Sequence, residues 1–512
     1  MIIKRFSAML TVLLMSVSVL AGCSSKKEQL QADGYISSLE ISSTIDYVDT
    51  AYIKSPQHAN PISSEMFCAD PTAIEYNGRL YVFGTNDQQQ FDLVEEGGNN
   101  YYGLIRSLVV FSTEDMVNWA YHGIIDVGAI APWIYNSWAP SIVSRVEDDG
   151  LTHFYLYFSD GGMGVGVLTA TNPLGPWSDP LQKPLINAST PGLHDCAIPF
   201  DPGVCIDDNG DAWIAFGGGR AYYGTNYLPG TARIAKLGED MVSLGSEIKD
   251  IDAPYFFEAS ELNYINGIYV YTYNTTWDER DEWHSDKPMP THCSMAYMTT
   301  KTPLDTDSWE YQGYYFPNPG ESGMEYGNSH THLHKYRDRY YLFHQTQQLQ
   351  SALGLSGGFR SIGVVETTVD ESTLSIPIIH ATREGVAQIS YGNASALNEA
   401  ECFSTCAGIG FLYDSNKLVT GIKSNEKGAN ILCRQYSFNS NSSEYFSATV
   451  SGKGCIEVRL DAPDGECAAA IEFDLSYPTG VYTALPEGIS GVHDVYFVFS
   501  GSGIGFYDWK FI

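Results

Sequence analysis

Basic residues are scarce in this chain. Its 512 residues hold 28 Lys and Arg against 61 Asp and Glu, which gives a formal net charge of −33. Nucleic-acid binding depends on a basic surface, so the composition excludes an ordinary binder of nucleic acids or polyphosphates. A hydrophobic content of 44 % excludes a fully disordered chain. The length predicts about two to four domains, each with a sizeable core.

Long apolar runs are also lacking, except near the N-terminus. There, two basic residues precede an apolar run from Phe6 to Leu20, and the run ends in Leu20-Ala21-Gly22-Cys23. This order predicts a signal peptide over residues 1–23, and the run is too short for a transmembrane helix. The ending resembles a bacterial lipobox, which implies a lipid anchor on Cys23; an ordinary secretory signal is the alternative. We therefore expect an extracytoplasmic protein at the bacterial cell surface, with residues 24–50 as a tether and membrane contact through the anchor alone.

Several common ligand motifs are absent from the sequence. No P-loop occurs, and the glycines of Gly161–Gly166 lack the dinucleotide spacing. No C-x-x-C pair has a matching partner, which disfavours a zinc ribbon. The nine cysteines after Cys23 leave two alternatives open, disulfides in an oxidising compartment or buried thiols. Strands do not alternate with long amphipathic helices, which disfavours a TIM barrel or a Rossmann fold.

Aromatic residues, in contrast, are abundant, at 13 % with 35 Tyr, and many lie in alternating strands. Flat rings stack on sugars, although β-propensity and core filling are the simpler explanation. Pairs of these strands flank turns such as Asn77-Gly78 and Asn266-Gly267, which are strong hairpin signals, and a third strand follows. Five such units, at a period of roughly 55–70 residues, predict a radial repeat, most simply a five-bladed β-propeller over residues 51–380. The hairpins are expected at Pro71–Thr85, Ser137–Ser159, Pro202–Gly218, Ala259–Asn274 and Ser329–Gln345.

Three acidic residues stand where the first strand of a predicted unit begins. They are Asp70 in the first unit, Asp201 in the third and Glu258 in the fourth. Because the innermost strand of each blade begins near the central axis, we expect these acids to converge in one funnel. Hydrolysis of a glycosidic bond needs such a set, since one acid protonates the leaving oxygen and one carboxylate activates water. A third carboxylate can raise the pKa of the acid. For a single Asp before Pro, a turn role is the alternative.

The sequence around these acids resembles the three acidic motifs of glycoside hydrolase family 43. The matching segments are Cys68–Thr72, Phe200–Gly210 and Phe257–Ser260, with supporting motifs at Ser112–Trp119, Trp138–Ser141 and Gly175–Trp177. The resemblance spans about Pro61 to Asp370. It implies an inverting mechanism with Asp70 as general base, Glu258 as general acid and Asp201 tuning and orienting Glu258. It implies no cofactor for the chemistry. Ser141 departs from the family, which often has Asp there, and this affects contacts to sugar.

Other residues near the expected axis are candidates for binding substrate or an ion. The resemblance places His330 near the axis, where relatives hold a calcium ion or a water. Arg360 resembles an arginine that reaches the sugar pocket in many relatives, with a surface role as the alternative. Trp138 is a candidate for the pocket wall, with a core position as the alternative.

The last 120 or so residues form a separate unit of strands at residues 390–512, which predicts an antiparallel sandwich. The ending Phe506–Phe511 completes a resemblance to family 6 carbohydrate-binding modules. It implies a jelly-roll β-sandwich with a structural calcium, for which Glu399, Glu401 and Asp508 are candidate ligands. It also implies that Tyr482 stacks on sugar. A purely structural module is the alternative, because Phe506 stands where relatives carry Asn.

The expected protein is an inverting hydrolase that removes pentose units from plant hemicellulose. The resemblance best supports an α-L-arabinofuranosidase acting on arabinoxylan. β-Xylosidase and endo-arabinanase activities are alternatives within the family, because loop lengths decide which chains enter the site. A non-catalytic, glycan-binding surface lipoprotein is the alternative from another class, and the intact set of three acids disfavours it.

Overall fold

The structure is a computed structural model that describes residues 35–36, 45–49, 53–55 and 58–512. The predicted signal peptide and Cys23 lie outside the described residues. Within these residues the helices are few and short: α2 (Asp87–Leu93), α3 (Val127–Ile130), α4 (Gln348–Ala352) and two 3-10 turns, Thr306–Ser308 and Pro319–Ser322. None of the helices in the described part of the chain is long and apolar enough to cross a membrane.

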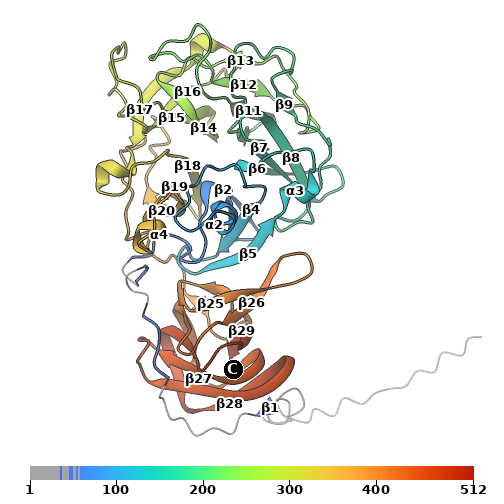
Figure 1. The fold of residues 1–512 in the computed structure, drawn as a ribbon, viewed down its shortest axis with the longest axis vertical. Coiled ribbons are helices and arrows are strands. Elements are labelled where there is room, and N and C mark those ends of the chain that lie inside the picture. Colours follow the sequence, from blue (N-terminus) through green and yellow to red (C-terminus); the bar gives the residue numbers. More distant parts are fainter. Residues whose placement is uncertain (1–34, 37–44, 50–52, 56–57) are drawn as a thin grey trace, which may run out of the picture.

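Five antiparallel sheets surround a common axis and form a five-bladed β-propeller (Figure 1). The predicted all-β fold is therefore confirmed, and within each blade the strands follow one another in chain order. The blades contain β2 (Ala69–Tyr76), β3 (Arg79–Thr85), β4 (Leu108–Thr113) and β5 (Trp119–Ile125); β6 (Trp138–Val146), β7 (Thr152–Ser159), β8 (Gly164–Ala170) and β9 (Ile186–Asn187); β10 (Gly203–Ile206), β11 (Ala212–Phe216), β12 (Arg233–Lys236) and β13 (Lys249–Asp250); β14 (Phe256–Ile265), β15 (Ile268–Thr275), β16 (Met295–Thr300) and β17 (Glu310–Phe316); and β18 (Thr331–Tyr336), β19 (Arg339–Thr346) and β20 (Ser361–Thr367).

The predicted hairpin turns are present and have the backbone that their sequence favours. Asn77 and Gly78 both have positive φ, 53° and 79°, and so do Asn266 and Gly267, at 49° and 83°. Positive φ at both central residues defines a type I′ turn, whose twist matches that of the two strands of a hairpin. Local sequence therefore defines the first two strands of these blades.

The ring of blades is closed by residues that precede the first blade. The side chain of Asn60 donates to the Val364 carbonyl at 2.9 Å, and the Val364 amide donates back to Asn60 Oδ1 at 2.9 Å. The Ile62 amide donates to the Ile362 carbonyl at 2.9 Å. The start of the propeller is thus bonded to β20 of the last blade, which fixes the first and fifth blades around the axis.

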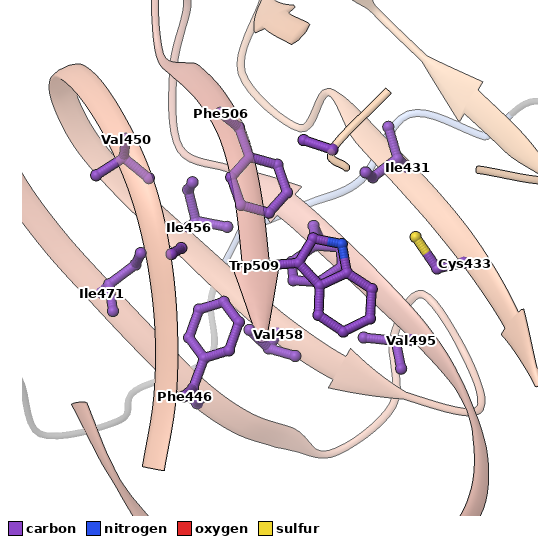
Figure 2. Packing of buried hydrophobic residues seen from close by; sticks show 14 of the residues in the cluster. Ile431, Cys433, Phe446, Val450, Ile456, Val458, Ile471, Val495, Phe506 and Trp509 are labelled. Atoms are coloured by element: carbon purple, nitrogen blue, oxygen red, sulfur yellow. The ribbon is translucent and has the colours of Figure 1, made fainter. Parts of the chain in front are cut away.

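A β-sandwich follows the propeller and has its own apolar core. Its two longest strands, β27 (Asn430–Leu460) and β28 (Cys467–Phe499), bend at irregularities in their register, so that Ile456 pairs with both Ile471 and Phe499. Trp509 is fully buried among Phe446, Phe497 and Phe511 (Figure 2). The remaining strands are β21 (Gly392–Asn393), β22 (Asn398–Glu399), β24 (Thr405–Ala407), β25 (Ile409–Tyr413), β26 (Val419–Ser424) and β29 (Gly505–Phe511).

The sandwich and the propeller share backbone and side-chain contacts. Strand β23 (Cys402–Phe403) extends the first blade, because Cys402 pairs with Ala120 and Phe403 with Trp119 of β5. Asn118 accepts from the Arg434 amide at 2.8 Å and donates to the Arg434 carbonyl at 2.9 Å. The two domains are therefore joined along one edge of the first blade.

Two short parts of residues 24–50, the predicted tether, are described, and both contact the sandwich. Strand β1 (Tyr35–Ile36) pairs with β28 in parallel, and the Val48 amide donates to the Gly428 carbonyl at 2.9 Å. Strand β1 can pair there because β28 has unpaired backbone groups at the edge of the sheet, whereas Val48 meets the loop before β27. The nine described cysteines are free thiols, and six of them are buried.

Candidate active site

The three predicted acids are placed by irregularities at the entrance of their strands. Asp70 and Asp201 have left-handed backbones, with φ of 51° and 48°, and so does Ala259 beside Glu258, at 57°. The hairpin registers shift at the same places, between Ala69 and Thr72 and on both sides of Glu258. A bulge of this kind turns a side chain out of the regular alternation of its strand. The backbone thereby directs the carboxyl groups into the central funnel.

All three carboxyl groups line one cavity of about 80 Å³ at the centre of the propeller. The predicted residues Trp138, Arg360 and His330 line it as well, together with Tyr102, Phe200, Asn328, Ser329 and Gln345. A second cavity of about 50 Å³ shares Tyr102, Asn328, Gln345 and Arg360 with it, so the site extends beyond the part that the acids line. Larger cavities, of about 300 and 630 Å³, lie along the boundary of propeller and sandwich and contain none of the three acids.

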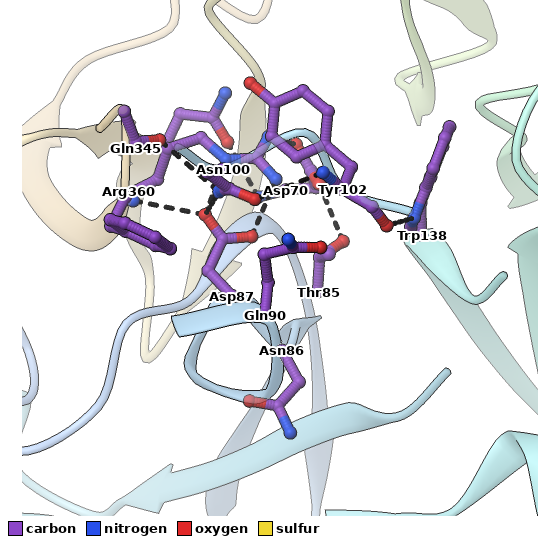
Figure 3. A network of polar contacts seen from close by, with 12 residues as sticks. Asp70, Thr85, Asn86, Asp87, Gln90, Asn100, Tyr102, Trp138, Gln345 and Arg360 are labelled. Carbon is purple, nitrogen blue, oxygen red and sulfur yellow. Dashed lines mark hydrogen bonds and ion pairs between the residues drawn. The ribbon is translucent and has the colours of Figure 1, made fainter. Parts of the chain in front are cut away.

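Asp70 is held as a carboxylate by cationic and hydroxyl donors (Figure 3). Arg360 Nη1 donates to Oδ1 at 2.9 Å, Thr85 Oγ1 donates to Oδ2 at 2.6 Å, and His330 Nδ1 lies 3.4 Å from Oδ1. Burial raises the pKa of Asp70, but Arg360 and His330 outweigh it and hold that pKa well below its usual range. The carboxylate can therefore accept a proton from water while staying ionised in the resting site.

Glu258 lies in the opposite electrostatic situation. Burial raises its pKa well above the usual range, and the charges of Asp201 and Asp70 raise it further, against a smaller opposing effect of Arg360. Burial also raises the pKa of Asp201, to about 6. Asp201 Oδ2 accepts from the Ala259 amide at 2.9 Å, so it fixes the backbone next to Glu258. The site thus places a carboxylate whose charged form is favoured, Asp70, beside an acid whose protonated form is favoured, Glu258, as acid–base chemistry on a glycosidic bond needs.

The sequence matches the family model of glycosyl hydrolases family 43 over residues 58–361. The chain belongs to this family. It is 34 % identical over 487 residues to an arabinoxylan arabinofuranohydrolase of Bacillus subtilis strain 168, covering 89 % of this chain and 92 % of the relative. It is 32 % identical over 490 residues to an arabinoxylan arabinofuranohydrolase of Paenibacillus polymyxa, covering 90 % of this chain and 75 % of the relative.

The fold of this family 43 chain is also similar to a solved structure over both domains. A crystal structure of a family 43 arabinoxylan arabinofuranohydrolase from Bacillus subtilis, in complex with cellotetraose, aligns with a TM-score of 0.81 and 32 % identity. The alignment covers 90 % of this chain and 98 % of that chain. This chain is therefore a glycoside hydrolase, and the prediction of an enzyme is confirmed.

His330 takes the position that the resemblance implies, close to the acids. Its contact with Asp70 raises the pKa of His330 against the effect of burial, which favours an imidazolium paired with a carboxylate. Among the residues that the structure describes, no three His, Cys, Asp or Glu side chains gather as they would around an ion. A calcium ion on the axis stays a prediction.

Two of the predicted ligands of the sandwich are neighbours, because Glu399 of β22 pairs with Asp508 of β29. Arg79 Nη2 donates to Glu399 Oε2 at 2.7 Å, so Glu399 is occupied by an ion pair with the propeller. Glu401 is buried, and Oε2 of its carboxyl has no hydrogen-bond partner within the described part of the chain. Burial raises the pKa of Glu401 to about 8, and the charges of Glu399 and Asp508 contribute. Carboxylates suit calcium, and a structural calcium ion at these three residues stays a prediction.

Tyr482 disagrees with its predicted role. Only 6 % of the residue is exposed, because it lies within the long strand β28 where β1 and β27 pair with it. A ring that stacks on a sugar must present a face to solvent. The structure therefore does not support sugar stacking by Tyr482.

The site also contains polar residues that sequence reasoning missed. Gln345 Oε1 accepts from the Asp70 amide at 2.8 Å, and Tyr102 packs on Arg360, with the guanidinium carbon 4.7 Å from the ring centre. Asp87 binds the same guanidinium (Figure 3). The one local signal is the polar run Asn86–Gln90, which directly follows the buried strand β3.

Proposed function

We propose that this family 43 hydrolase removes α-L-arabinofuranosyl units from arabinoxylan with inversion of configuration. The relatives with full-length similarity are named arabinoxylan arabinofuranohydrolases, which supports the sugar and the polymer. The observation that carries the mechanism is the contrast between Asp70, with a lowered pKa, and Glu258, with a raised pKa, in one small cavity.

In the proposed reaction, Asp70 takes a proton from a water molecule as that water attacks the anomeric carbon. The bond from the anomeric carbon to the leaving oxygen breaks, and Glu258 gives its proton to that oxygen. The products are free arabinose of inverted configuration and a xylan of unchanged backbone length, which carries a hydroxyl group where the arabinose was attached. Arg360 and His330 keep Asp70 ionised before the reaction. Asp201 keeps Glu258 protonated through its charge and holds the adjacent amide of Ala259.

Rates and products on four substrates test the choice of sugar. The purified protein is expected to hydrolyse nitrophenyl α-L-arabinofuranoside faster than nitrophenyl β-D-xylopyranoside, and to release arabinose as the only monosaccharide from arabinoxylan. Release of xylose as the main product would favour a β-xylosidase. Release of arabino-oligosaccharides from linear arabinan would favour an endo-arabinanase.

We also propose that the sandwich is a carbohydrate-binding module that keeps the propeller near plant cell-wall polysaccharide. Its β-rich fold with a separate core supports this. Because Tyr482 is buried, other residues of the sandwich must form the surface that binds the polysaccharide. Mixing the protein with insoluble arabinoxylan tests the proposal: the wild type should be depleted from the supernatant, and depletion should persist in Asp70→Asn, which leaves the module unchanged. An unbound wild type would indicate a structural domain.

We propose a lipid anchor on Cys23, supported by the Leu20–Cys23 motif. Expressed in a bacterium with lipoprotein processing, the wild type should enter the detergent phase, and Cys23→Ala should remain in the aqueous phase. A wild type that stays in the aqueous phase would contradict the anchor.

A further inference from the structure

Asp87 is a fully buried carboxylate that the proposed chemistry does not use. It lies at the start of α2, outside the cavity that the three acids line, and none of its surface is exposed. Its two oxygens accept four N–H groups: Nη2 of Arg360 at 2.8 Å, Nε of Arg360 at 2.9 Å, the Arg360 amide at 3.1 Å and the Asn100 side chain at 2.7 Å. All four partners donate, which is the pattern of an ionised carboxyl group.

The guanidinium of Arg360 is divided between two carboxylates. Nε and Nη2 bind Asp87 as a fork, and Nη1 binds Asp70 Oδ1 at 2.9 Å (Figure 3). The ring of Tyr102 covers one face of the guanidinium. A bidentate fork fixes both the position and the plane of a guanidinium, whereas a single hydrogen bond leaves a long side chain several rotamers. Asp87 is therefore the contact that determines where Nη1 points.

We propose that Asp87 is a positioning residue of the reaction, which acts by fixing Arg360 so that Nη1 orients the carboxylate of Asp70. The proposal rests on the role of Asp70 as general base in the proposed function. Asp87 is 17 positions from Asp70 in the sequence and 273 positions from Arg360. No sequence motif of the chain connects Asp87 to the site. Misplacing a reacting group by about 1 Å can lower a rate about 100-fold, so a residue outside the cavity can control the rate.

The acidic limb of the pH–rate profile does not distinguish a positioning role of Asp87 from a purely structural role. Removal of the negative charge of Asp87 favours ionisation of Asp70, whereas release of Arg360 opposes it, and the two effects have opposite signs. Asp201, Glu258 and His330 also face Asp70 across the cavity. The decisive property is the coupling between Asp87 and Arg360, because a residue that acts only through Arg360 has no effect once Arg360 is gone.

A double-mutant cycle measures this coupling. Asp87→Asn, Arg360→Ala and the double variant are compared with the wild type, using whichever nitrophenyl pentoside the wild type hydrolyses faster. We expect Asp87→Asn to lower kcat about 10- to 100-fold, and the double variant to be no slower than Arg360→Ala within about threefold. Losses that multiply in the double variant, or a folded Asp87→Asn with unchanged kcat, would overturn the proposal.

Guanidinium rescue provides a readout that a structural role would not change. Free guanidinium, added well below unfolding concentrations, should partly restore kcat to Arg360→Ala, since Asp87 and Asp70 still form its binding site. The rescue should be absent from the double variant, and equal rescue in both would contradict the proposal. If circular dichroism shows that Asp87→Asn is unfolded, Asp87→Glu replaces it in the cycle, because it keeps the charge and displaces the fork by one methylene.

Asp115→Asn is the matched control. Asp115 is also buried in the first blade and accepts four N–H groups, from the Val117 amide, the Asn118 amide and side chain, and Gln388. It follows β4 at the end of the blade away from Asp70. We expect it to lower the thermal midpoint without lowering kcat of the folded enzyme. The anomeric configuration of the product is measured separately, so that failure of Asp70 as a base and failure of the coupling are told apart.

Discussion

Asp201→Asn is expected to move the alkaline limb of the pH–rate profile downward. Asp201 carries its charge above a pKa of about 6, and this charge raises the pKa of Glu258. Like charges shift one another's pKa at separations up to about 6 Å, where an effective dielectric constant of about 20 gives a repulsion of about 3 kcal/mol, or about two pKa units. Because Glu258 must be protonated to act as an acid, loss of this charge should move the limb down by about one to two units.

The assay is kcat/KM against pH on an arabinosylated xylo-oligosaccharide, because its leaving hydroxyl depends on protonation. The ratio reports the pKa values of the free enzyme. The groups that face Glu258 besides Asp201 are Asp70, Arg360 and the side chain of Asn328, and all are retained in the variant. The new Asn can still accept the hydrogen bond from the Ala259 amide, which preserves the local backbone.

Asp207→Asn is the matched control for this experiment. Asp207 is buried in the same blade but directly follows the far end of β10, where Tyr269 and Trp213 donate to it at 2.6 and 3.2 Å. Asp207→Asn should not change the position of the alkaline limb of the pH–rate profile. An unchanged alkaline limb in Asp201→Asn, or a limb moved to higher pH, would refute the reasoning that Asp201 tunes Glu258.

Three further predictions concern the acid, a buried lysine and the second domain. Glu258→Gln should lower turnover of arabinoxylan about 10²- to 10⁴-fold. Turnover of nitrophenyl arabinofuranoside should fall much less, because nitrophenol leaves with little protonation. Equal losses on both substrates would argue against Glu258 as the acid. Lys54 is 2 % exposed, and burial lowers its pKa to about 7. The unfolded chain therefore binds more protons between about pH 7 and 10.5, so this group costs up to about 5 kcal/mol of stability below pH 7 and little above pH 10.5. Lys54→Met should raise the thermal midpoint more at pH 6 than at pH 10, and an equal rise would contradict the shifted pKa. Deletion of residues 394–512 exposes the edge of β5 that pairs with Cys402–Phe403. We expect this deletion to lower the thermal midpoint of the propeller by at least about 5 °C. A midpoint within about 1 °C of that of the full chain would contradict a stabilising interface.

The sequence was sufficient to predict the features that depend on neighbouring residues. Asn-Gly turns and alternating strands define hairpins locally, so the number of blades followed from the repeat. The convergence of Asp70, Asp201 and Glu258 also followed, because equivalent strand starts of a radial repeat meet at the axis. The left-handed backbone at these positions explains how a residue at a strand entrance reaches the funnel.

Contacts between distant segments could not be predicted in the same way. Asp87 and Arg360 are 273 residues apart, and no periodicity connects a helix start in the first blade with a loop before β20. The expectation for Tyr482 was incorrect because its exposure depends on which strands pair with β28. The contacts of the predicted tether with the sandwich could not be predicted either, since a polar segment without periodicity carries no sign of the segment that it meets.

The configuration of the first-formed sugar tests the central claim most directly. NMR is recorded during early hydrolysis of nitrophenyl α-L-arabinofuranoside, before mutarotation mixes the anomers. With Asp70 activating water and Glu258 protonating the leaving oxygen, the first product should be β-L-arabinofuranose, and Asp70→Asn should abolish its formation. A first product with the α configuration would mean that a nucleophile forms a covalent intermediate, and it would contradict the assignment of Asp70 as a base.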